Sequence, residues 1–166
     1  MRILGIDPGL ATVGLGLVDA ASVHQITALE WLTITTKAGV PAPERLLEIQ
    51  KDLTAFIAEA KPEMAVVERL FFETNVQTAM DVAQARGVIL LTLGEAGIPV
   101  LEPTPLQLKS AITGDGKADK RQVQEMLMRM LNLTAIPTPD DAADALALAV
   151  YGALHHASPV ASPQRA

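Results

Sequence analysis

Acidic side chains stand at the ends of several predicted elements, where they could hold a metal ion. Asp7 follows the apolar segment 2–6 and precedes a Pro-Gly turn, and Glu68 follows the apolar run 64–67. Each has an ordinary alternative role, since Asp7 can satisfy the amides of its own turn and Glu68 can be a surface acid that ends a strand. Asp144 lies in an otherwise apolar helical segment, where a buried acid needs a partner.

The segment 138–144, Thr-Pro-Asp-Asp-Ala-Ala-Asp, opens this last helical segment. Thr138 can cap the helix, and an acid three residues later can complete a capping box. Asp140 shares a helical face with Asp144 at i, i+4, and Asp141 does so at i, i+3. Spacing alone therefore does not choose between Asp140 and Asp141 as the partner of Asp144.

Convergence of these acids would favour a particular chemistry. Carboxylates a few ångströms apart repel one another unless they are protonated or bridged by cations. The chain has no cysteine, and oxygen ligands without cysteine or clustered histidine favour hard ions such as Mg²⁺ or Mn²⁺. Two such ions about 3.5–4 Å apart are a known arrangement for phosphodiester hydrolysis.

The elements that must position the acids follow from the period of the apolar residues. The segments that favour strands, and those that favour helices, together predict a mixed sheet flanked by helices. The segment 13–18 alternates glycine with larger residues, as a strand beside a crowded neighbour would. The predicted strands are 2–7, 13–18, 23–34, 64–68 and 99–101, and the predicted helices are 46–57, 76–96, 104–112, 119–131 and 140–155.

Length and composition limit the remaining possibilities. The chain has 166 residues, 49% of them apolar, which suits one folded domain over residues 1–157 with a Pro/Ser-rich, disordered tail at 158–166. The lack of cysteine excludes a disulfide scaffold and fits a reducing compartment. No secretory signal or membrane-length apolar run is present, so we expect a cytoplasmic protein with no membrane contact. The net charge of −6 is untypical of DNA-binding proteins.

Three acidic blocks, in this order and spacing, resemble the RuvC family of bacterial Holliday-junction resolvases. They are Gly-Ile-Asp-Pro-Gly at 5–9, Val-Val-Glu at 66–68 followed by Phe71, and Asp-Ala-Ala-Asp-Ala-Leu-Ala at 141–147. Further matches are Gln-Ala-Arg-Gly at 84–87, Gln-Leu-Lys at 107–109 and the lysine-rich loop through Lys120. The similarity runs from residue 1 to about residue 155.

The resemblance implies a ribonuclease-H-like α/β fold, with a five-stranded mixed sheet flanked by helices on both faces. It makes Asp7, Glu68, Asp141 and Asp144 the catalytic residues and metal ligands, and it favours Asp141 over Asp140 because the family pair reads Asp-x-x-Asp before Ala-Leu-Ala. It also implies two Mg²⁺ ions per active site, which Mn²⁺ can replace. Two divalent ions would change the formal charge from −6 to about −2, so the net negative charge of the chain does not exclude binding to DNA.

The activity that the resemblance implies is that of a crossover junction endodeoxyribonuclease. A homodimer would nick two strands of like polarity at symmetric points of a four-way DNA junction, in homologous recombination and DNA repair, and would meet the RuvAB branch-migration motor. The segment 76–96 is similar to the family's dimer helix. Its small and aliphatic residues fit either a dimer contact or an ordinary core face: Ala79, Val82, Ala83 and Val88.

Two segments could contact the DNA. Lys109, Lys117, Lys120 and Arg121 lie within 13 residues that hold only two acids, although a solvated loop is the ordinary interpretation. The resemblance favours Lys109 and Lys120 as phosphate contacts.

The second segment follows Glu68. Phe71 and Phe72 stand in a polar stretch, and an aromatic there either anchors the loop in the core or stacks on an unpaired base. The resemblance favours base contact by Phe71, and Arg69 is a candidate phosphate or base contact.

Three other functions compete with junction resolution. A sugar kinase or actin-like ATPase also opens with a strand and an Asp-x-Gly turn, but it needs a second lobe for which 166 residues leave no room. A non-catalytic junction-binding dimer would not need Asp144 inside an apolar helix. The nearest alternative is another ribonuclease-H-like nuclease that acts on different DNA or on RNA.

Overall fold

The computed structural model describes residues 1–69 and 76–156, and its centre is a five-stranded mixed sheet. The strands β1 (Arg2–Asp7), β2 (Thr12–Ser22) and β3 (Gln25–Thr35) form an antiparallel meander. Two shorter strands, β4 (Met64–Val67) and β5 (Val100–Leu101), continue the sheet in parallel beyond β1, in the order β3-β2-β1-β4-β5. The mixed sheet predicted from the sequence is confirmed.

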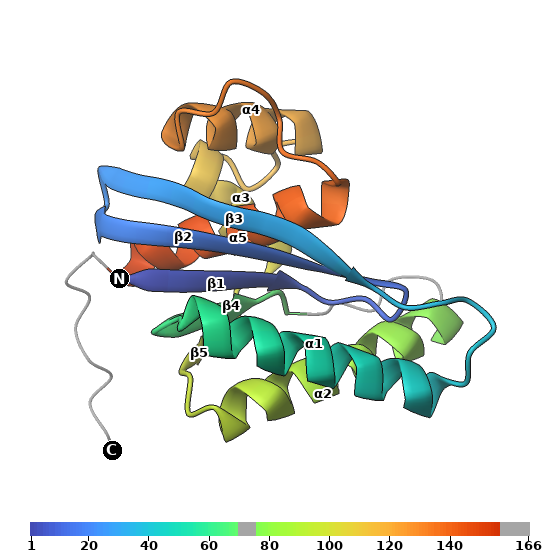
Figure 1. Ribbon diagram of the computed structural model, residues 1–166. Coiled ribbons are helices and arrows are strands. Elements are labelled where there is room, and N and C mark those ends of the chain that lie inside the picture. Colours follow the sequence, from blue (N-terminus) through green and yellow to red (C-terminus); the bar gives the residue numbers. More distant parts are fainter. Residues whose placement is uncertain (70–75, 157–166) are drawn as a thin grey trace, which may run out of the picture.

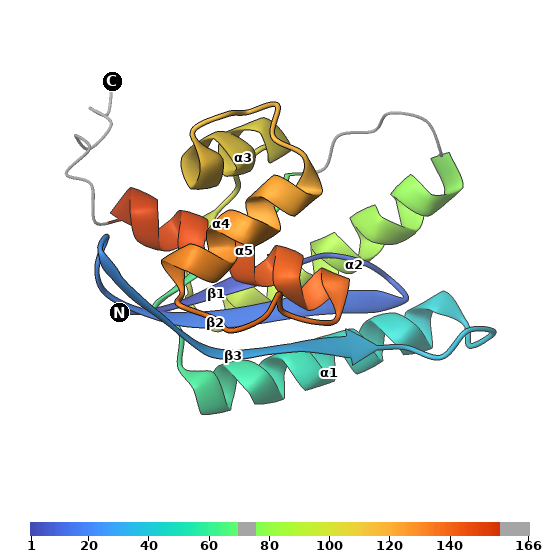
Figure 2. The ribbon, with the colours of Figure 1, turned by 90° about the horizontal axis from the view of Figure 1, so that it is seen from above.

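Helices cover both faces of this sheet (Figure 1). On one face lie α1 (Ala42–Ala60) and α2 (Val76–Glu95), and on the other lie α3 (Pro105–Thr113), α4 (Lys120–Met130) and α5 (Asp140–His156), as the view from above also shows (Figure 2). All five predicted helices are present. The first is longer than predicted at both ends, and it begins at Ala42 with a proline in its first turn, where a missing N–H costs nothing. None of the helices that the structure describes is both long and apolar enough to cross a bilayer.

The alternation of side chains along β1 sorts its residues between the two helical layers. Leu4 and Ile6 are fully buried against α1 and α2, whereas Ile3 is buried on the side of α5. Because successive side chains of a strand point to opposite faces, Gly5 and Asp7 share the face of Ile3. The last residue of β1 therefore presents its carboxylate on the face that α5 covers.

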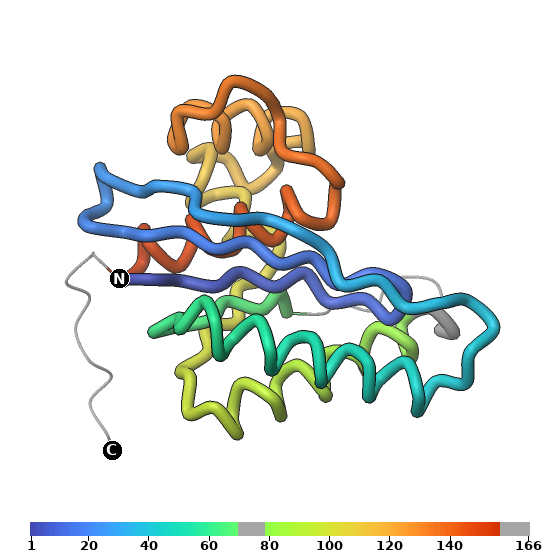
Figure 3. The backbone as a smooth tube through the Cα atoms, in the orientation of Figure 1, coloured from blue at the N-terminus to red at the C-terminus, as the bar shows by residue number. Residues whose placement is uncertain are grey.

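Glycines let the backbone of α5 lie directly on β1 and β2. The backbone tube shows α5 running along these two strands (Figure 3). A Cβ at any of three glycines would overlap the helix backbone: it would lie 1.9 Å from Ala145 O at Gly5, 2.0 Å from Asp141 O at Gly14, and 2.5 Å from Leu146 Cα at Gly16. The crowded neighbour predicted for the glycine-rich second strand is confirmed, and it is α5.

This close contact predicts a large penalty for a single methyl group. We expect Gly5→Ala to destabilise the protein by about 3 kcal/mol, which is roughly 6–12 °C in Tm, because the overlapping atom is backbone and cannot rotate away. Gly94→Ala is the matched control, since Gly94 is an exposed helical position with no atom within 4 Å of the added Cβ. Thermal unfolding of both variants checks this, and equal Tm values for the two would contradict it.

Candidate active site

Asp7 and Glu68 leave the sheet from neighbouring strands. Ile6 of β1 pairs in parallel register with Val67 of β4, so the residues that follow them lie side by side. Val66, two residues before Glu68, packs on the α5 side, so Glu68 belongs to the same face as Asp7. The convergence of these two acids therefore follows from strand register alone.

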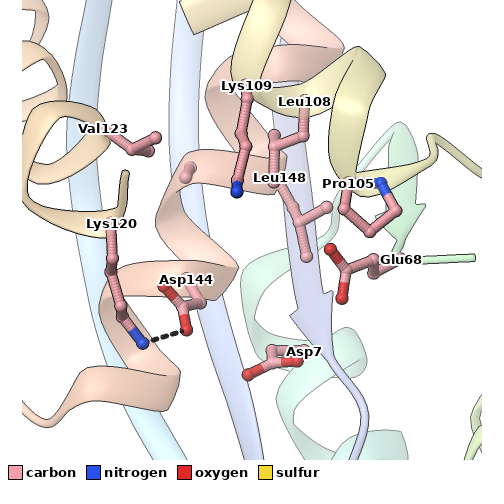
Figure 4. A pocket seen from close by; sticks show the side chains of 10 residues that line it. Asp7, Glu68, Pro105, Leu108, Lys109, Lys120, Val123, Asp144 and Leu148 are labelled. Atoms are coloured by element: carbon pink, nitrogen blue, oxygen red, sulfur yellow. Dashed lines mark hydrogen bonds and ion pairs between the residues drawn. The ribbon is translucent and has the colours of Figure 1, made fainter. Parts of the chain in front are cut away.

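Asp144 reaches the same place from the helix above the sheet. It lies one turn into α5, and its side chain is half-buried although the helix around it is almost entirely buried. Figure 4 shows its carboxylate pointing into the space that Asp7 and Glu68 also face. This space is a cleft of about 240 Å³, and its remaining described lining residues are Pro105, Leu108, Lys109, Lys120, Val123, Ala147 and Leu148.

Burial and mutual repulsion raise the pKa values of the converging acids. Burial is the main cause of a rise in the pKa of Asp7 to about 7, and the negative charges of Asp144, Glu68 and Asp141 add to it. The pKa of Glu68 is raised by burial and then by Asp144, whereas Lys109 lowers it. Repulsion of this kind is relieved by a bound cation, so the electrostatics of the cleft fit a cation site.

Lys120 supplies positive charge to this cleft from α4. Its Nζ donates hydrogen bonds to Asp144 Oδ2 at 2.8 Å and to Asp140 Oδ2 at 2.5 Å, and Gln124 Nε2 donates to Asp140 Oδ1 at 3.1 Å. Burial lowers the pKa of Lys120, but the two carboxylates outweigh it and raise the pKa above its usual value. Asp140 thus holds Lys120 beside Asp144.

Asp141 has different surroundings from its neighbour Asp140. It lines a second hollow with the turn 9–12, and its charge contributes to the raised pKa of Asp7. Sequence spacing left both acids as partners of Asp144, because both share a helical face with it. In the structure Asp140 is engaged by α4, whereas Asp141 remains close enough to influence Asp7.

The donor set fits a hard divalent cation, because its members are carboxylates. As the side chains stand, no three acidic or histidine residues in the described ranges 1–69 and 76–156 are close enough to share one ion. Sharing an ion would therefore require the carboxylates of Asp7, Glu68 and Asp144 to turn toward one another.

Two arginines support the end of β4, and only one of them, Arg69, belongs to the predicted set. Arg86 of α2 donates from Nε to the carbonyl oxygen of Glu68 at 3.0 Å and forms an ion pair with Glu102. The amide of Arg69 donates to Pro103 O at 2.9 Å. Arg86 is a positioning residue for Glu68 that the sequence analysis did not assign, although it lies within the 84–87 match.

The predicted DNA contacts are placed differently from one another. Lys109 and Lys120 line the cleft. Lys117 and Arg121 are exposed and do not belong to the described lining; Arg121 pairs with Glu125 at 2.8 Å. The side chain of Arg69 is exposed beside Glu68. Phe71 and Phe72 lie outside the described residues.

Comparison with known proteins gives the family. The model of the family described as "Crossover junction endodeoxyribonuclease RuvC" matches residues 3–152. The chain belongs to the RuvC family. It is 54% identical over 150 residues to the crossover junction endodeoxyribonuclease RuvC of Chloroflexus aurantiacus, covering 90% of this chain and 91% of that protein, and 49% identical over 150 residues to the RuvC of Syntrophomonas wolfei, covering 90% and 87%.

A solved RuvC structure also matches the fold. The RuvC of T. thermophilus in complex with a Holliday junction substrate superposes with a TM-score of 0.89 at 34% identity, covering 95% of each chain. The predicted ribonuclease-H-like fold is thereby confirmed for this member of the RuvC family.

The raised pKa of Asp7 predicts how the stability of this RuvC-family chain depends on pH. The folded pKa of about 7 lies above the unfolded value of 3.8, so without cations the stability falls as pH rises from about 4 to 7. At pH 8, in a chelator, we expect Asp7→Asn to be more stable than the parent by on the order of 2 kcal/mol, with no difference below pH 4.

Denaturant unfolding between pH 3.5 and 8 measures this difference. Asp52→Asn is the matched control, because Asp52 is an exposed acid on α1 away from the cleft, and we expect its curve to follow the parent. If the free energies of unfolding of the parent and of Asp7→Asn changed in parallel with pH, the ionisation of Asp7 would not destabilise the fold, and the prediction would be wrong.

Proposed function

We propose that this RuvC-family chain resolves four-way DNA junctions, by paired symmetric nicks made through metal-dependent phosphodiester hydrolysis in homologous recombination and DNA repair. The observation that carries the proposal is the convergence of Asp7, Glu68 and Asp144 on one cleft that also holds Lys109 and Lys120. Junction DNA as substrate is supported by family membership and by the junction-bound RuvC relative.

The proposed ligands are Asp7, Glu68, Asp141 and Asp144, and the proposed ions are two Mg²⁺ per active site, which Mn²⁺ can replace. Such ions supply Lewis-acid stabilisation of phosphate charge and lower the pKa of water. The chain's own contribution is to fix the backbone positions from which the carboxylates reach the cleft: Asp7 ends β1, Glu68 follows the paired strand β4, and Asp144 lies on a helix in backbone contact with the sheet. Water attacks phosphorus and the bond to the 3′ oxygen breaks, leaving 5′-phosphate and 3′-hydroxyl ends without a covalent protein intermediate.

The two lysines bind the phosphate oxygens in this proposal. Lys109 enters the cleft from α3 and already lowers the pKa of Glu68. The Lys120 ammonium releases its hydrogen bond to Asp144 and donates it to a phosphate oxygen, while its ion pair with Asp140 keeps it at the edge of the cleft. Arg69, Lys117 and Arg121 are exposed and remain proposed as outer DNA contacts.

A homodimer is proposed because two symmetric nicks need two active sites. In the described part of α2, the buried apolar residues are Ala85, Ile89 and Leu93. Met80 and Leu91 of the same helix are more than half exposed, at 52% and 57%. Exposed large apolar residues on one helix support a contact with a second copy. The residues that the sequence analysis named are half-buried, and one of them also packs on the core: Ala79, Val82, Ala83 and Val88.

Interaction with the RuvAB branch-migration motor and a cytoplasmic location are proposed on family membership alone.

A cleavage assay tests the nuclease proposal against its nearest alternative, another ribonuclease-H-like nuclease. We expect Mg²⁺-dependent nicking of a synthetic four-way junction in preference to duplex, flap and RNA–DNA hybrid. Asp7→Asn should lower the rate by at least about a thousandfold and leave junction binding within a few-fold, because it removes a cation ligand. Asp52→Asn is the control for charge. Full activity of Asp7→Asn would contradict the proposed site. Cleavage of the RNA–DNA hybrid as fast as that of the junction would favour another ribonuclease-H-like nuclease.

Base stacking at the crossover is tested through Phe71, which lies outside the described residues. We expect Phe71→Ala to slow cleavage of an intact junction more than that of a junction with unpaired bases at its centre, because stacking is worth about 1–3 kcal/mol per base. Phe72→Ala is compared in the same assay, since Phe72 is the weaker candidate. Equal losses on both substrates would argue against a stacking role.

A further inference from the structure

We propose that Arg45 binds a phosphate of the DNA strand being cut, on the opposite side of the acids from Lys109 and Lys120. The inference rests on the proposed nuclease function and adds a contact to it. Arg45 stands near the start of α1, a helix that contributes none of the described residues lining the cleft. The case comes from a neighbouring hollow, from the way this side chain is anchored, and from the charges around it.

A second hollow, of about 350 Å³, borders the acidic centre. Its wall is formed by the turn 9–12 after β1, by Arg45, by Asp81 and Val82 of α2, and by Asp141 of α5. None of its described lining residues also lines the cleft of Lys109 and Lys120. Since Asp141 lines the hollow whereas Asp7 lines the cleft, the acids stand between two separate depressions.

The guanidinium of Arg45 is fixed at one nitrogen. Its Nε donates to Thr36 Oγ1 at 2.8 Å, and the Thr36 hydroxyl in turn donates to Leu10 O at 2.6 Å. The amide of Thr36 also donates to Ala11 O at 3.0 Å, so this anchor is part of the turn that lines the hollow. A guanidinium has five N–H donors in a planar fork, and within the described residues only the Nε donor of Arg45 has a partner.

Among the described residues, no acid forms an ion pair with Arg45. Asp81 and Asp141 are the other charged residues of the described wall, and neither forms an ion pair with Arg45 in the described part of the chain. Because both are anionic, the hollow has no general attraction for anions. A phosphate is held there only by direct, paired hydrogen bonds from the guanidinium, a geometry that suits Arg and phosphate.

A DNA strand that crosses the acids needs such a contact. Every nucleotide carries a phosphate, so a strand with its scissile phosphate at Asp7 also places phosphates on both sides of it. Lys109 and Lys120 line the cleft on one side. The geometry points to Arg45 as the cation on the other side, at the turn that follows β1.

The salt dependence of junction binding tests the charge. All proteins carry Asp7→Asn to prevent cleavage. The affinity for a four-way junction is measured between about 50 and 200 mM salt, a range over which binding through phosphate contacts weakens steeply. We expect Arg45→Gln to weaken binding about tenfold and to reduce the slope of log K against log salt by about 0.9. Lys51→Gln, the same charge change at an exposed site on α1, should leave the slope unchanged.

Two further variants separate phosphate binding from support of the turn. Thr36→Val removes the anchor but keeps the charge, so its slope should equal that of the parent. Arg45→Lys keeps the charge but lacks the fork, so its slope should be retained while its affinity falls. An unchanged slope in Arg45→Gln, or the same slope change in Thr36→Val, would show that Arg45 only supports the turn and would overturn the proposal.

Junctions with one neutral methylphosphonate locate the contact. The neutral group is placed in turn at each of the phosphates flanking the cut site. At one of them the parent should lose about tenfold in affinity, whereas Arg45→Gln should lose nothing further, because the two changes remove the same contact. Additive losses at every position would overturn the proposal. Failure of the unmodified protein to bind or nick junctions would instead overturn the proposed function, and with it this inference.

Discussion

The contact between the backbone of α5 and the glycines of β1 and β2 determines where the acids of this molecule stand. A side chain at Gly5, Gly14 or Gly16 would push the helix away from the sheet. Asp144 would then be withdrawn from Asp7, which is carried by the sheet itself. Small residues here serve geometry rather than flexibility, because they let a helix approach a sheet to the distance at which groups carried on each can act on the same phosphate.

This close approach concentrates negative charge that the fold does not otherwise need. Burial and neighbouring carboxylates raise the pKa of Asp7 to about 7, and Lys120 offsets only part of the repulsion through Asp144 and Asp140. The repulsion lowers the stability of the fold, and the apolar layers on both sides of the sheet offset this loss, as is common where function requires like charges close together. The site therefore favours ligands that bring positive charge, because without them the repulsion between its carboxylates is strongest.

Much of the fold and part of the site follow from local patterns in the sequence. Apolar periodicity indicates every element, the alternation of glycine in residues 13–18 indicates a crowded neighbour, and the ends of strands indicate Asp7 and Glu68. Tertiary contacts decide the rest. Asp140 and Asp141 are equivalent by spacing, and only the approach of α4 separates them. Arg86 escapes sequence reasoning because its partner is a backbone carbonyl distant in the chain, which leaves no trace in residue types.

The two walls of the cleft differ in how firmly they are held. The carboxylates belong to the sheet and to the helix fused against it, whereas Lys109 and Lys120 are carried by α3 and α4, which pack chiefly on α5 and on each other. That pair of helices forms an outer layer, which contributes Ile112 and Leu127 to the apolar core on this face of the sheet. The acids and the lysines of the cleft therefore depend on different packing contacts, so a substitution that loosens α3 and α4 would displace the lysines before the acids.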